Sequence, residues 1–171
     1  IWVSIKSNIV KETSVEIIKD YVLDHLLDKK EIEVWKLCVN YALLFSETYL
    51  LMLESTDLRM LRDEKEKSFI AYQNGILEVT KDKANLIGYM DVEDYVWESQ
   101  ILKRDYVEHK DFSNDYQTFV YNVSNKTPEP LESVIGYLIS TYKNKMNNKA
   151  IILNDEVISD FAEGGTGKGL L

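Results

Sequence analysis

The sequence predicts an α+β fold that is mainly α-helical and carries a small β hairpin, in a chain of 171 residues. Several segments repeat apolar residues every three or four positions, which is typical of one helix face, and an Asn-Gly pair stands between two short β-prone runs. The apolar fraction of 45% and the charged fraction of 29% are those of a folded domain. We expect a helical module over residues 1–147 and the start of a second domain over residues 148–171.

The N-terminal part is expected to begin with a strand and continue as two helices. IWVSIKSNIV alternates apolar and polar residues, which predicts a short strand that would pair with something outside this chain. Apolar residues at helical spacing then predict a helix from an N-cap at Ser14 to about Lys29. A longer helix is predicted from Ile32 to Glu54, and its broad apolar surface suggests burial on more than one side.

The middle of the chain holds the hairpin signal. In SFIAYQNGILEVT, residues 68–80, Asn74 and Gly75 separate two β-prone runs and suit the positive φ angles of a type I′ turn. ANLIGYM predicts a third short strand. We expect helices over YVWESQIL (95–102), 114–125 and 131–142, with Pro128 and Pro130 between the last two, and a strand over KAIIL (149–153).

A glycine-rich stretch, AEGGTGKGLL, occupies residues 162–171. In a phosphate-binding loop, G-x-x-x-x-G-K-[ST], backbone N–H groups surround the phosphates, the lysine neutralises them and the hydroxyl holds Mg²⁺. Gly167 and Lys168 supply the central pair, but Ala162 stands at the first glycine and Gly169 at the hydroxyl residue. On spacing alone, a phosphate loop and a flexible glycine tail are equally compatible with this stretch.

Other reactive side chains give little sign of a site. His25 and His109 have no second His or Cys at ligand spacing, so we do not expect a metal site. Asp155 and Glu156 follow the last predicted strand, where a turn with two solvated carboxylates is favoured over a metal site. The single cysteine, Cys38, lies in an apolar helical context and is interpreted as a buried structural thiol rather than a nucleophile.

Charge and aromatic content restrict the partners. A net charge of −9 argues against a whole surface that binds phosphates, so any nucleic-acid contact must be local. The acid-free stretch TYKNKMNNKA offers Lys143, Lys145 and Lys149 for such a nucleic-acid contact, although a solvated linker is favoured. The aromatic residues from Tyr89 onward lie among acidic residues, so core packing is favoured over base stacking.

The lengths of the apolar stretches, the cysteine content and the first residue indicate where the chain resides and whether it is part of a longer protein. No apolar stretch approaches the roughly 20 residues that a membrane-spanning helix needs, so we expect no contact with a membrane. One cysteine fits a reducing cytoplasm. Because the chain begins with Ile1 rather than Met, we expect it to be a piece of a longer protein. We expect this piece on its own to be a monomer or a weak dimer.

Three stretches in order resemble a known family. The stretches SFIAYQNGILEVT, YVWESQILKRDY and LESVIGYLISTYKNKMNNKAIILNDEVISDFAEGGTGKGLL are similar to the region that leads into the ATPase of phage and plasmid primase-helicases of the helicase superfamily 3 type, which are similar to the poxvirus primase-helicase. In that family an "NG" hairpin, a Trp-containing segment and an "IGY" helix precede a strand and a glycine-rich phosphate loop. The resemblance covers roughly residues 68–171.

The resemblance implies a parent protein that hydrolyses ATP with Mg²⁺ while moving along single-stranded DNA as a hexameric ring, in a bacterial or phage-infected cytoplasm. It also implies that residues 148–171 are the first strand and truncated phosphate loop of the ATPase domain. Gly169 departs from the usual Ser or Thr, which leaves the Mg²⁺ ligand open. The residues expected to contact ATP phosphates are Gly164, Gly165, Thr166, Gly167 and Lys168, with Lys168 reaching the terminal ones.

Residues 1–171 alone are expected to be catalytically silent, because nothing in them matches the acidic, sensor and arginine-finger residues of such a motor. A different class of function is also open. The chain would then be a non-enzymatic interaction domain whose glycine-rich tail is only a linker, which agrees with its acidic charge and with the departures from the loop pattern.

Overall fold

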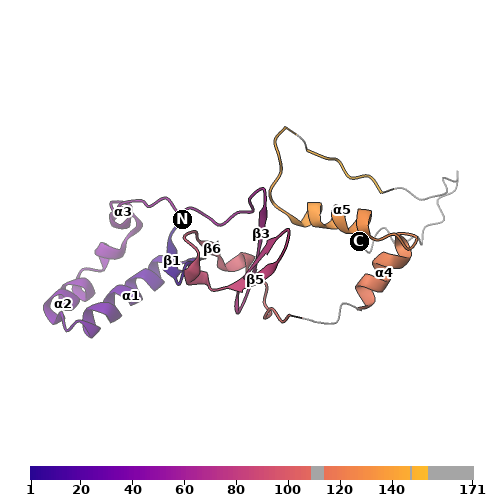
Figure 1. Cartoon of the computed structure of the whole chain (residues 1–171). Coiled ribbons are helices and arrows are strands. Elements are labelled where there is room, and N and C mark those ends of the chain that lie inside the picture. The colour runs from indigo at the N-terminus through magenta and orange to yellow at the C-terminus, as the bar shows by residue number, and fades with distance from the viewer. Residues whose placement is uncertain (109–113, 147, 154–171) are drawn as a thin grey trace, which may run out of the picture. The chain divides into compact units, whose positions relative to one another are not determined.

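The computed structural model describes residues 1–108, 114–146 and 148–153 (Figure 1). This part of the chain has an α+β fold with five α-helices and two three-stranded sheets, so it contains more β-structure than the single predicted hairpin. It forms two compact units. The first contains residues 1–61, 70–77 and 85–106, and the second contains residues 62–69, 78–84 and the described residues from 107 onward.

The first sheet has the strand order β1-β2-β6. Strands β1 (Val3–Lys6) and β2 (Ile9–Glu12) form an antiparallel hairpin, and β2 pairs in parallel with β6 (Val96–Trp97). Ser7 and Asn8 make the turn with φ angles of 50° and 61°, the positive values that a type I′ turn requires. The predicted N-terminal strand therefore has its partners inside this chain.

Residues 15–54 form what we call the helical arm. Helix α1 (Val15–Asp28) confirms the first predicted helix. The prediction of one long second helix that is buried on more than one side is wrong. The segment is divided into α2 (Ile32–Asn40), the 3₁₀ turn η1 (Ala42–Phe45) and the short α3 (Glu47–Leu50), and Leu50 is its only buried residue. Tyr41, with ψ 68°, and Ser46, with ψ 151°, leave the helical region and make the two breaks. Figure 1 shows α1 and α2 packed side by side.

The second sheet has the order β3-β4-β5 and contains the predicted hairpin and third strand: β3 (Lys67–Tyr72), β4 (Gly75–Thr80) and β5 (Ala84–Ile87). The turn differs from the prediction, because Gly75 has a positive φ of 153° but Asn74 does not. Asn74 acts through its side chain instead. Its amide donates to the Tyr106 carbonyl at 2.9 Å, and its Oδ1 accepts from the Tyr106 N–H at 2.8 Å.

The helix predicted over residues 95–102 is wrong. This stretch follows the 3₁₀ turn η2 (Tyr89–Asp91) and forms β6 and a further 3₁₀ turn, η3 (Glu98–Gln100). The Val96 N–H donates to the Asn8 carbonyl at 2.9 Å, and the Val96 side chain is only 3% exposed. Sheet pairing and burial of a β-branched residue therefore override the local helical pattern.

The second unit confirms two predicted helices, α4 (Asp115–Val123) and α5 (Glu129–Ile139). The Asn114 side chain caps α4 by accepting from the Gln117 N–H at 2.8 Å. The prediction that Pro130 lies between the two helices is wrong, because it lies in the first turn of α5, where its missing N–H is tolerated. The strand predicted over residues 149–153 is wrong, since this described segment belongs to no strand. The boundary near Asn147 stays a prediction.

Helices in the described ranges are all too short or too polar to cross a membrane.

Candidate functional site

The candidate ATP contacts stay predictions, because Gly164, Gly165, Thr166, Gly167, Lys168 and Gly169 lie outside the described residues. The same holds for His109 and for Asp155 and Glu156. The candidate nucleic-acid contacts are described, and they follow the C-terminal end of α5.

Lys143 caps helix α5. Its ammonium group donates to the carbonyls of Tyr137 and Ser140, the latter at 2.6 Å, and lies 4.0 Å from the centroid of the Tyr137 ring. A cation is stabilised there because the last carbonyls of a helix lack partners and carry partial negative charge. Lys143 therefore has a local structural role, and a phosphate would have to compete with these carbonyls for it.

The other two lysines follow α5 in the chain, and the backbone of Lys149 contacts the Tyr137 side chain of that helix. The Tyr137 hydroxyl accepts from the Lys149 N–H at 3.0 Å and donates to the Lys149 carbonyl at 3.4 Å. This contact occupies the backbone N–H and carbonyl of Lys149, the first residue of the predicted strand. Lys145 and Lys149 are exposed, so their ammonium groups are the better placed of the three to contact phosphate.

Asp63 fixes the end of α5 from a distant part of the sequence. One carboxylate oxygen accepts from the Phe69 N–H at 2.7 Å, and the other accepts from the Thr141 N–H at 2.7 Å and the Ser140 hydroxyl at 3.3 Å. These bonds attach β3 to the first residues of the lysine segment. The sequence contains no signal for this role, because Asp63 lies within an ordinary charged stretch.

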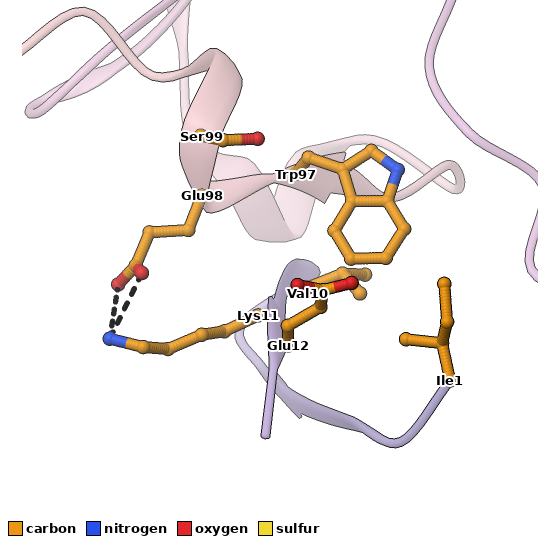
Figure 2. A pocket seen from close by; sticks show the side chains of 7 residues that line it. All are labelled: Ile1, Val10, Lys11, Glu12, Trp97, Glu98 and Ser99. Carbon is orange, nitrogen blue, oxygen red and sulfur yellow. Dashed lines mark hydrogen bonds and ion pairs between the residues drawn. The ribbon is translucent and has the colours of Figure 1, made fainter. Parts of the chain in front are cut away.

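The first unit contains an open pocket of about 490 Å³ (Figure 2). Trp97, Val10 and Ile1 make its apolar side, and an ion pair of 2.9 Å between Lys11 and Glu98 stands on the other. Strand β2, strand β6 and turn η3 bring these side chains together, with Glu12 and Ser99 completing the lining. The lining has a hydroxyl but no histidine to act as its base, so it offers binding contacts rather than a nucleophile.

No group of His, Cys, Asp and Glu in the described part of the chain could hold a metal ion. His25 lies against Tyr21, with ring centroids 6.1 Å apart. The interpretation of Cys38 as a buried thiol is wrong. Its exposure is intermediate, and helix α2, which contains it, has no buried residue.

The aromatic residues are packed less deeply than predicted, since the core of the described residues contains none of them. Tyr89 is half-buried, and its hydroxyl donates to the Tyr72 carbonyl at 2.6 Å. Burial raises the pKa of Tyr89. Tyr106 is 5.4 Å from Tyr72 between ring centroids, and the Arg104 guanidinium lies 5.8 Å from the Tyr72 ring. These contacts join the hairpin to the segment that follows β6.

No family model matches this chain, and comparison with curated proteins and with solved structures gave no match either. A function has to be inferred from the residues and contacts described above.

Proposed function

We propose that this chain is a module of a replicative primase-helicase and precedes an ATP-driven motor that moves on single-stranded DNA. The observation that carries the proposal is an order of features along the chain. The Asn74-Gly75 hairpin, the Trp97 segment, helix α5 with its Ile-Gly-Tyr sequence and the glycine run at 164–169 follow one another as they do in superfamily 3 primase-helicases.

In this proposal the glycine run and Lys168 hold the ATP phosphates in the parent protein, and Mg²⁺ takes a ligand other than residue 169. Lys145 and Lys149 offer phosphate contacts to the DNA strand, with Lys143 committed mainly to the end of α5. The parent protein assembles as a hexameric ring. Residues 1–171 have no turnover of their own, because the residues that complete such a site lie elsewhere in the parent.

The test is DNA-stimulated ATPase activity of the parent protein with Lys168→Ala. We expect turnover to fall by at least about a hundredfold, because the lysine neutralises the phosphates on which charge develops. Lys83→Ala is the matched control, since Lys83 is an exposed lysine of the second unit and should leave turnover unchanged. Equal rates for Lys168→Ala and wild type would remove Lys168 from the mechanism, and ATP turnover by residues 1–171 alone would contradict the proposed silence.

A second candidate is a non-enzymatic interaction domain with a glycine-rich linker. It is favoured by the exposed apolar residues of the helical arm, such as Leu51 at 75% and Met52 at 76% exposure, and by the net charge of −9. The coding sequence beyond residue 171 separates the two candidates. An apolar strand that ends in two acidic residues favours the motor, whereas a Ser-, Gly- and Pro-rich stretch favours the linker.

A further inference from the structure

The outer face of helix α1 exposes apolar side chains. Ile17 and Tyr21 are one helical turn apart and are 56% and 69% exposed, and His25, another turn on, stacks on Tyr21. Helix α1 has no buried residue. An apolar row on a helix is normally the part that packs against a neighbour, so this face has the character of a contact surface.

An acidic row runs beside the apolar row. Glu16, Asp20, Asp24 and Asp28 follow at intervals of four residues, which places them one above another on the helix, and all four are exposed. Each neighbouring pair repels, and this disfavours the helix. Within α1 the cation that offsets part of this charge is Lys19, whose ammonium group lies 3.4 Å from the carboxylate of Asp20.

From this charge pattern we propose that the outer face of α1 docks a basic amphipathic α-helix of a different protein. The apolar face of that helix would cover Ile17 and Tyr21, and its Lys or Arg residues, repeated every fourth position, would face the acidic row. Helix α1 has 14 residues and is therefore about 21 Å long, which matches four turns of a partner helix. Binding would replace the repulsion along the row with attraction.

Charge argues against other occupants. The helical arm carries eight Asp or Glu residues and four Lys residues, a net charge of −4. Helices α4 and α5 have acidic first turns and no basic residue in their last turns, so a second copy would offer acidic helices to an acidic face. Nucleic acids and anionic lipid surfaces carry negative charge as well and would be repelled.

The test uses a labelled synthetic peptide of Leu and Lys, with Leu on one helical face and Lys every fourth residue beside it, and follows its fluorescence anisotropy with residues 1–171. A shuffled peptide of the same composition should bind at least roughly tenfold more weakly, because it has the charge but no apolar face. Binding should also weaken as salt is added, since exposed charges are screened. Equal binding of the shuffled peptide would overturn the proposal.

Two variants separate the apolar and acidic contributions. Tyr21→Ser and the double change Asp20→Asn with Asp24→Asn should each weaken binding roughly tenfold. Met90→Ser and Asp82→Asn, at an apolar and an acidic residue exposed elsewhere, are the matched controls and should bind like wild type. The Asn changes remove repulsion within α1 and should therefore not unfold the helix. A loss of binding while the circular dichroism spectrum is retained is then due to the lost acidic contacts.

Three results would contradict the proposal: unchanged binding by Tyr21→Ser, unchanged binding by the Asn double variant, or dimers of residues 1–171 in sedimentation that disappear with Tyr21→Ser. The last result would assign the face to a second copy. None of these results depends on Lys168, so this proposal and the proposed ATP-driven function can fail separately.

Discussion

The β-structure of the first unit and the helical arm bury their apolar residues very differently. Val10, Ile76 and Val96 of the strands are at most 3% exposed, whereas Leu50 is the only buried residue of the helical arm. Both regions have a regular apolar pattern in the sequence. The difference shows that periodicity places apolar side chains on one face but does not supply the surface that covers them.

The two regions also differ in the range of their polar contacts. The Asn8 side chain donates to the carbonyls of Tyr89 and Val92 at 3.1 and 2.7 Å, and joins residues more than 80 positions apart. In the described arm the side-chain ion pairs are local, such as Lys36 with Glu33 at 2.9 Å. Because local contacts resist opening less than a long-range network does, we expect the arm to exchange its amide hydrogens before the strands do.

Removing a buried side chain from the strands should have the largest effect. Ile76 is fully buried, so Ile76→Ala should lower the free energy of unfolding by about 3 kcal/mol through lost burial and the cavity left behind. Leu51 in the arm is 75% exposed, so Leu51→Ala should change the free energy of unfolding by less than about 0.5 kcal/mol. Urea denaturation measures both. A similar loss for the two variants would show that the arm is covered in solution.

A smaller effect is expected at the hairpin. Gly75 has φ 153°, and a Cβ at this position would lie 2.6 Å from the Ile87 carbonyl oxygen. Gly75→Ala should therefore lower the free energy of unfolding by about 2 kcal/mol, because the backbone is strained and the oxygen must move. Urea midpoints with an unchanged slope would report this loss.

The matched control is Gly136→Ala in helix α5, where nothing lies within 4 Å of the added Cβ. Alanine is the better helix former, so this change should stabilise the protein by roughly 0.5–1 kcal/mol. If both changes destabilised the protein equally, the contact at Ile87 would not be the cause at Gly75. The pair thus compares a strand position that excludes a side chain with a helix position that accepts one.

The elements that the sequence predicted correctly have local signals. Helix periodicity marks α1, and the Asn-Gly pair marks the β3–β4 hairpin. Strand β6 was missed because its partner, β2, lies more than 80 residues earlier, and no local pattern encodes that parallel pairing. The predicted burial of the segment from Ile32 to Glu54 was wrong for a similar reason, since a helical pattern does not reveal whether a covering surface exists.

The candidate site shows the same limit. Its lysines could be selected from composition, but the cap that Lys143 forms depends on where α5 ends. The Asp63 contact with Thr141 crosses 78 residues and joins two segments with no shared motif. The Trp97 pocket requires the pairing of β2 with β6 and could not be predicted either. Side chains that act alone are visible in a sequence, whereas side chains that act across the fold are not.

A smaller destabilisation than at Gly75 is expected at Tyr89, whose hydroxyl donates to the Tyr72 carbonyl at 2.6 Å. Tyr89→Phe leaves that carbonyl without this donor and should lower the free energy of unfolding by about 1 kcal/mol near neutral pH. Tyr21→Phe, in the exposed arm, removes a hydroxyl from a 69% exposed side chain and should have no measurable effect. Urea denaturation of the two variants compares a tyrosine that joins distant segments with one that does not.

The pH dependence of stability tests the same contact. Burial raises the pKa of Tyr89 in the folded protein, so above pH of about 10 the unfolded chain releases this proton while the folded protein retains it. The contribution of Tyr89 to stability is therefore complete below pH of about 10 and is lost as the pH rises through the higher folded pKa. Stability should fall less steeply above this pH in Tyr89→Phe than in wild type or Tyr21→Phe. Identical slopes in all three proteins would mean that Tyr89 is as accessible to solvent as the tyrosines of the arm.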